Sequence, residues 1–156
     1  MKDIVNYLID NNLTISTMES CTGGELASSI TSIPDASKVI SFSAVTYSNE
    51  FKIKMGVDPE LIDKYSVYSM EVAKDMSKKI SIYTGSTFGV GITGKFNKKD
   101  ENNPFGNDSI VFISIYDSRS NTYLVKELEV VKLNRKDNKK EVIDAFEEMF
   151  KIKYNI

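Results

Sequence analysis

Strand-like and helix-like segments alternate along this chain, and the alternation limits the folds that it can adopt. Short runs rich in apolar and β-branched residues predict strands at 13–17, 39–47, 87–93, 109–117 and 121–131. Apolar residues at helical spacing, with Pro and Gly at the ends, predict helices at 2–11, from after Thr22 to 33, 49–55, from 58 onward, 70–83 and 137–152. This order favours an α/β domain.

The last two predicted strands are joined by the short turn 118–121, so they must pair antiparallel. Strands separated by helices favour parallel pairing, and the sheet is therefore expected to be mixed, with helices on both faces. We find no repeat, low-complexity tract or linker in the 156 residues. Residues 1–156 are thus expected to form a single domain.

Composition removes several classes of function. The formal net charge is −2, so we expect neither a nucleic-acid partner nor a basic membrane anchor. No apolar run approaches the ~18 residues of a membrane span. The single cysteine is typical of a reducing compartment, and 2–11 lacks the pattern of a signal peptide, so we expect a cytoplasmic protein.

The chain contains no histidine. This absence excludes a Ser-His-Asp triad, a Cys-His pair and histidine-based zinc motifs, and a single cysteine excludes thiolate metal sites. We accordingly expect no metal and no cofactor. If the protein is an enzyme, its general base must be Lys, Asp, Glu or Tyr.

Residues 18–29, MESCTGGELASS, join a predicted strand to a predicted helix. Thr22 and Glu25 have the spacing of a capping box, which would start the helix. Gly23 and Gly24 then fall in the first helical turn, where glycine is unfavourable unless something approaches the backbone closely. Free amides at such a turn suit an oxyanion or a phosphate. A plain glycine-containing turn accounts for the same pattern equally well.

Two side chains at this turn are candidate nucleophiles. Ser20 lies just before the turn, where a strand-to-helix elbow would display its hydroxyl. Cys21 is the alternative, because a helix N-terminus lowers the pKa of a thiol. No histidine can pair with it, however, and lone cysteines are usually packed as small hydrophobic residues.

A serine nucleophile in this chain needs a base other than histidine, and a desolvated lysine can serve. The segment 44–56, AVTYSNEFKIKMG, ends a buried strand at Tyr47 and continues into a short helix that carries Lys52 and Lys54. If strands 13–17 and 39–47 are neighbours, Ser20, Tyr47 and Lys52 meet in one crevice at the sheet edge. Spacing alone does not choose between the two lysines, and either is compatible with a solvated helical position.

These segments together resemble one known family. ESCTGG at 19–24, VTYSNEFK at 45–52 and MGVDPELIDKYSVYSMEVAKDM at 55–76 are similar, in this order, to the C-terminal domain of the CinA family. Stand-alone members of that family are nicotinamide-nucleotide amidohydrolases. The resemblance implies hydrolysis of the carboxamide of nicotinamide mononucleotide to nicotinic acid mononucleotide and ammonia. It also implies a homodimer with a small-molecule nucleotide as its substrate.

The resemblance assigns roles by position. Ser20 corresponds to the nucleophile, Lys52 to the general base and Tyr47 to a third catalytic member that assists proton transfer. Substrate-binding positions carried over in the same way are Thr22, Gly23, Gly24, Asn49, Gly91, Thr93 and Gly94.

The chain departs from the family pattern in its third block. The family's G-I-A-G-P and following glycine-rich stretch are replaced by GITGKFNKKDENNPFGND at 91–108, with Lys95 in the place of the proline. Lys95, Lys98 and Lys99 are candidate phosphate contacts, although a solvated loop is the more common role of such a run. Arg135 weakly resembles the family's late G-D-R motif.

The altered loop keeps two alternatives open. One is a nucleotide-binding module of the same fold that has lost or changed its turnover. The other is a hydrolase of the same chemistry that acts on a different amide.

Overall fold

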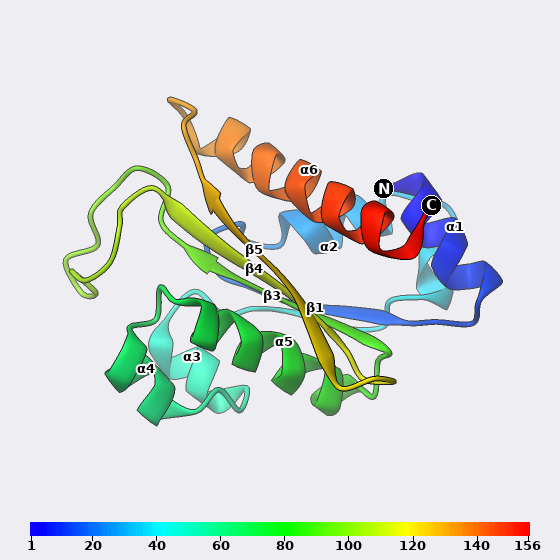
Figure 1. Cartoon of the computed structure of the whole chain (residues 1–156), viewed down its shortest axis with the longest axis horizontal. Helices are drawn as coiled ribbons and strands as arrows, with labels where there is room; N and C mark the ends of the chain where they lie inside the picture. The colour runs from blue at the N-terminus through cyan, green and yellow to red at the C-terminus, as the bar shows by residue number, and fades with distance from the viewer.

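The computed structural model describes residues 1–156 and contains one five-stranded sheet, in the order β2–β1–β3–β4–β5 (Figure 1). The strands are β1 (Ile15–Glu19), β2 (Ser43–Val45), β3 (Phe88–Gly94), β4 (Ile110–Asp117) and β5 (Thr122–Glu129). β1 pairs in parallel with β2 and β3, whereas β3–β4 and β4–β5 are antiparallel. The predicted mixed sheet is confirmed.

Helices cover both faces of this sheet, as predicted. In Figure 1, α1 (Lys2–Asp10), α2 (Glu25–Thr31) and α6 (Arg135–Tyr154) lie on one face. The other face carries α3 (Asn49–Lys54), α4 (Pro59–Tyr65) and α5 (Met70–Thr84), and a 3-10 turn, η1 (Ala36–Lys38), precedes β2. None of these helices combines the length and apolar character that crossing a membrane requires.

The two faces of β3 are built differently. Phe88, Val90 and Ile92 point into the larger hydrophobic core, which α1, α2 and α6 close. The alternate residues are glycines that face α5: a Cβ at Gly89 would lie 1.9 Å from the Ser77 carbonyl oxygen, and one at Gly91 would lie 2.2 Å from that of Ala73. These two glycines therefore allow α5 to lie directly against the sheet.

Two helix caps follow the sequence prediction, and one strand does not. The Ser69 hydroxyl accepts from the amide of Val72 at the start of α5, and the Asp58 carboxylate accepts from Glu60 at the start of α4. The predicted strand 39–47 is wrong in its extent, because only Ser43–Val45 pair. β2 is an edge strand whose single partner is β1; beyond its ends Val39 and Thr46 each make one backbone hydrogen bond to β1, but residues 40–42 form no ladder with it.

Candidate active site

The chain leaves β1 through a tight turn that begins at Ser20. The Ser20 amide donates to the Ile92 carbonyl oxygen at 3.0 Å, which extends the β1–β3 pairing by one residue. Gly23 and Gly24 follow with φ angles of 64° and 94°, and side-chain-bearing residues rarely adopt these values. The glycine pair is thus required by the turn itself, immediately after the candidate nucleophile.

The predicted capping box is wrong. α2 starts at Glu25 without a side-chain cap from Thr22. The carboxylate of Glu19 serves instead: it accepts from the amides of Leu26 and Ala27 and from the hydroxyls of Thr17 and Thr22, at 2.7–3.1 Å. Glu19 is fully buried, so one acidic group locks β1, the turn and α2 together.

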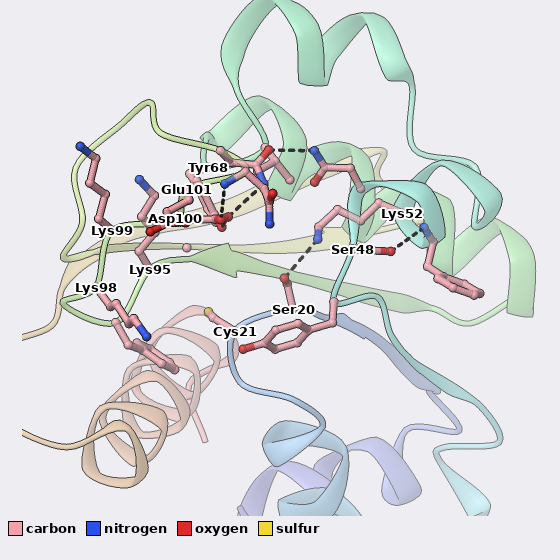
Figure 2. Close-up of a pocket in the computed structure, with 18 of the residues that line it drawn as sticks. Ser20, Cys21, Ser48, Lys52, Tyr68, Lys95, Lys98, Lys99, Asp100 and Glu101 are labelled. Atoms are coloured by element: carbon pink, nitrogen blue, oxygen red, sulfur yellow. Dashed lines mark hydrogen bonds between the residues drawn. The ribbon is translucent and has the colours of Figure 1, made fainter.

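Lys52 reaches Ser20 from the opposite side of the pocket. Its Nζ lies 3.1 Å from Ser20 Oγ and donates to the Thr46 carbonyl oxygen at 2.7 Å; Figure 2 shows the contact with Ser20 as a dashed line. The Lys52 side chain is only 1% exposed. α3 presents it because the Ser48 hydroxyl caps that helix, accepting from the Phe51 amide.

Burial lowers the pKa of Lys52 from 10.5 to about 8, because the charged amine loses its hydration. The negative charge of Asp100 acts in the opposite direction but does not offset the burial. About a tenth of the amine is therefore neutral at pH 7, and the neutral form predominates above pH 8. A neutral amine has a lone pair that can accept the proton of the Ser20 hydroxyl.

The structure separates the candidates that sequence spacing left open. Lys54 is exposed and pairs with Glu50 on the outer side of α3, so it does not contact Ser20. Cys21 is 5% exposed, and burial raises the pKa of its thiol to about 12. A thiol with that pKa is protonated at neutral pH and is a poor nucleophile.

Ser20 and Lys52 open onto a cavity of about 1110 Å³. Of the predicted site residues, Tyr47, Asn49 and Gly94 also line it, as do the cationic residues Lys98, Lys99 and Arg135. Tyr47 is 65% exposed, and its hydroxyl accepts from Arg135 Nη2 at 3.1 Å. The structure therefore brings Tyr47 to the same cavity, but its hydrogen bond is to Arg135 and not to the Ser20–Lys52 pair.

The other predicted substrate-binding residues do not line this cavity. Thr22 is buried and bonds to Glu19. Gly23 and Gly24 shape the turn behind Ser20. Gly91 lies under α5, and the Thr93 hydroxyl donates to the Val67 carbonyl oxygen. Their positions indicate structural roles for Gly91 and Thr93 and do not support direct contact with a substrate.

One known protein family matches almost the whole of this chain. The sequence profile of the CinA C-terminal domain matches residues 1–152. The chain belongs to this family. Among solved structures, the competence/damage inducible protein CihA from Agrobacterium tumefaciens is 27% identical, with a TM-score of 0.85, and the match covers 99% of this chain and 92% of that one.

Further relatives of this CinA domain are either less similar in sequence or much longer. A CinA superfamily protein from Enterobacter cloacae shares the fold, with a TM-score of 0.85 at 19% identity over 96% of this chain and 88% of that one. A competence-damage inducible protein from Clostridium botulinum is 45% identical over 92 residues, which are 58% of this chain and 22% of the relative. The chain thus spans about a fifth of the length of the curated relatives that it matches.

The loop 95–108 of this CinA domain is held by Lys95. The Lys95 side chain is buried, and its Nζ donates to the Phe105 carbonyl oxygen at 3.0 Å and to Asp108 at 2.9 Å. It also lies 4.9 Å from the centre of the Tyr68 ring. Lys95 therefore fastens the two ends of the loop to each other. Its charge is already paired, which leaves Lys98 and Lys99 as the free cations of the predicted phosphate-contacting run.

Sequence reasoning missed a polar network inside the same loop. The Asp100 carboxylate accepts from the Tyr68 hydroxyl and from Asn103 Nδ2, and Figure 2 shows Tyr68 and Asp100 together on the pocket wall. Asn103 Oδ1 in turn accepts from Asn49 Nδ2 at 2.9 Å. The Tyr68 hydrogen bond lowers the pKa of Asp100, so its carboxylate is ionised at neutral pH. No local motif announces this network, because its members are up to 54 positions apart.

Proposed function

We propose that this CinA domain is an amidohydrolase that converts nicotinamide mononucleotide to nicotinic acid mononucleotide and ammonia. The observation that carries the proposal is the 3.1 Å contact between Ser20 Oγ and the buried amine of Lys52. A serine paired with a lysine of lowered pKa is a known arrangement for hydrolysis without histidine. The substrate is suggested by the family resemblance.

The cavity supports a substrate of this size and charge. Its volume of about 1110 Å³ is sufficient for a mononucleotide. Lys98, Lys99 and Arg135 outnumber the acidic Asp100 and Glu101 in the lining, which gives it a positive charge that suits a phosphate, and Ser20 and Lys52 line the same cavity. A phosphate bound by these cations would leave the ring and its carboxamide free to reach Ser20.

The proposed reaction steps follow from the Ser20–Lys52 pair. Neutral Lys52 takes the proton of the Ser20 hydroxyl as Oγ attacks the carboxamide carbon. The tetrahedral intermediate collapses, and ammonia leaves after receiving that proton from Lys52. Water then attacks the acyl-Ser20 ester, with Lys52 again accepting the proton, and this step releases the carboxylate and restores the hydroxyl of Ser20.

The turn after Ser20 supplies a donor for the developing oxyanion. Gly23 and Glu25 donate their amides to the carbonyl oxygens of Ser20 and Thr22, but the amide of Cys21, a residue that lines the cavity beside Ser20, has no backbone acceptor. An unengaged amide beside the nucleophile is suited to an oxyanion, and a well-placed donor is worth ~3–4 kcal/mol in the transition state. Tyr47 takes the proposed relay role only if its hydroxyl turns from Arg135 toward the pair when substrate binds.

Ammonia release from nicotinamide mononucleotide tests the proposal. The wild-type protein should form ammonia and nicotinic acid mononucleotide in equal amounts, and Ser20→Ala and Lys52→Ala should each lose at least about 1000-fold in kcat. Lys54→Ala is the matched control, since this lysine lies on the same helix but is exposed. It should keep wild-type activity.

The same assay separates the alternatives. A module that binds the nucleotide without turnover would show calorimetric binding and no ammonia. A hydrolase for another amide would show neither binding nor turnover with this nucleotide, yet its Ser20 would still react with a serine-directed reagent. Equal activity of wild type and Ser20→Ala would reject the nucleophile assignment. The expected homodimer is tested separately by sedimentation equilibrium.

A further inference from the structure

The helix that carries Lys52 has little packing of its own. α3 contains six residues, and Lys52 is its single buried side chain. Phe51 and Ile53 are 55% and 41% exposed. A helix this short is not stable in isolation, and it is normally held by burying an apolar face. In α3, polar contacts must therefore provide more of the stabilisation.

The loop 95–108 that faces α3 is also held mainly by side chains. Among the backbone hydrogen bonds outside helices and strands, this loop makes one at its start, from Lys95 to Ile110, and one inside, from Asn103 to Asp100. Side chains supply the remaining anchors. Lys95 joins the two ends of the loop, and Asp100 accepts from Tyr68.

Asn103 connects these two weakly packed segments. Its Oδ1 accepts from Asn49 Nδ2 at 2.9 Å, and its Nδ2 donates to Asp100 Oδ2, also at 2.9 Å. Asn49 is the first residue of α3 and precedes Lys52 by less than one helical turn. The Asn49–Asn103 bond thus runs directly from the loop to the helix start.

The Asn49–Asn103 hydrogen bond lies between two cavities and not within the packed core. Asn49 and Asn103 line the cavity of Ser20 and also a second cavity of about 520 Å³, which reaches Tyr65 and Phe105. With open space on both sides, neighbouring side chains cannot take over if the bond is lost. The position of α3 relative to the loop therefore depends on this pair of amides.

We propose that Asn103 is a positioning residue that, through Asn49, fixes α3 and so holds the amine of Lys52 against Ser20. The inference rests on the proposed function for the role of the Ser20–Lys52 pair, but not on the identity of the substrate. Asn103 itself takes no part in proton transfer. Because the loop 95–108 provides Asn103, this CinA domain uses that loop to complete its catalytic geometry.

Labelling of Ser20 by a fluorophosphonate tests the inference without the natural substrate. In this reaction the Ser20 Oγ–phosphorus bond forms, fluoride leaves, and Lys52 accepts the hydroxyl proton. Asn103→Ala removes two side-chain hydrogen bonds, of which only the one from Asn49 reaches α3; loss of that bond should slow the maximal labelling rate about tenfold, with little change in the half-saturating reagent concentration. Mass spectrometry of the peptide that contains Ser20 gives the rate.

Asn97→Gly is the matched control. Asn97 lies on the same loop, and its side chain also makes one hydrogen bond, to the Lys132 carbonyl oxygen, away from α3. Glycine suits its φ of 54°. This variant should label at the wild-type rate and unfold at a urea concentration similar to that of Asn103→Ala, which separates positioning of Lys52 from general loosening of the loop.

A double-mutant cycle makes the proposal falsifiable in a second way. Asn49→Ala should slow labelling as much as Asn103→Ala, and the double variant should be no slower than either. Independent, multiplying effects would overturn the proposal, and so would an Asn103→Ala protein that labels at the wild-type rate. A wild-type protein that labels but does not hydrolyse nicotinamide mononucleotide rejects the proposed substrate, and the labelling cycle still decides the role of Asn103.

Discussion

The amine of Lys52 lies 3.1 Å from the hydroxyl of Ser20, although 32 positions separate these residues in the sequence. They meet because β1 and β2 are parallel neighbours, with Glu19 paired to Val45, so both chains leave the sheet at the same edge. The turn after β1 displays the hydroxyl, and the short helix after β2 returns the lysine to it. Gly23 and Gly24, which follow Ser20, permit that turn because both have positive φ angles.

The first prediction concerns pH. Lys52 acts as a base only when neutral, so kcat/KM for nicotinamide mononucleotide should rise with pH through a midpoint near 8, the pKa of the buried amine. Two pH units below that midpoint, activity should be about 100-fold below the plateau. A pH–rate profile checks this expectation. A flat profile, or a midpoint below pH 7, would contradict the assignment of Lys52 as the base.

The same burial of the Lys52 amine should lower the free energy of unfolding of the protein. Unfolded Lys52 keeps its proton up to pH 10.5, while the folded protein releases it near pH 8. Between these values the unfolded state binds more protons, so the stability of the wild type rises with pH, and the full penalty applies below pH 8. Lys52→Met, which also loses the Thr46 hydrogen bond, should be more stable than wild type at pH 7 by on the order of 1–2 kcal/mol.

Urea unfolding at pH 7 and pH 10 measures this difference. The advantage of Lys52→Met should shrink as the pH rises, because only the wild type contains the titrating amine. A difference that is the same at both pH values would show that the folded protein does not lower the pKa of Lys52.

Glu19 should be among the residues most important for stability. Its buried carboxylate accepts four hydrogen bonds, and Glu19→Ala leaves those donors without a partner. The expected loss is on the order of 3–5 kcal/mol in the free energy of unfolding. Glu25→Ala is the control, because Glu25 is exposed and should cost less than about 1 kcal/mol. Equal losses would favour the capping box that the structure lacks.

Gly91 should tolerate no side chain. A Cβ there would lie 2.2 Å from the Ala73 carbonyl oxygen and 2.7 Å from the Ser77 amide nitrogen, so α5 would have to move off the sheet. Gly91→Ala should cost roughly 3 kcal/mol or more, as measured by urea unfolding. At Gly85 an added methyl group would meet no atom within 4 Å, but φ is +70°, so Gly85→Ala should cost only about 1 kcal/mol. The reverse order would contradict the close packing of α5 on β3.

Local sequence patterns were sufficient to predict the helices and strands and part of the candidate site. Apolar spacing predicted the α/β order, and Asp58 and Ser69 could be recognised as caps because each acts within three residues of its own position. Ser20 and Lys52 could be selected because the family resemblance marked them. Their contact depends on parallel pairing of β1 and β2, which the alternation of strands and helices also indicates.

Such local patterns could not predict the long-range polar contacts. Glu19 falls after the predicted strand 13–17, where no local motif gives it a role, and its role as a cap depends on how β1 and α2 pack. Lys95 reads as one of three loop lysines, and only the fold buries it against Asp108. The segment 39–47 reads as one longer strand because it is rich in apolar and β-branched residues, yet the ladder with β1 forms only at Ser43–Val45, and Val39 keeps a single backbone hydrogen bond from Ile15.

Nucleophilic catalysis by Ser20, with Lys52 as the base, requires a covalent acyl intermediate on Ser20. The decisive measurement is rapid acid quenching of the Cys21→Ala protein during turnover of nicotinamide mononucleotide, followed by peptide mass spectrometry, because this variant has neither a thiol nor a second hydroxyl beside Ser20. We expect an acyl group on the peptide that contains Ser20, accumulating less in Lys52→Ala. Turnover at the wild-type rate in Ser20→Ala, with no acylated peptide at any time, would refute the proposed mechanism.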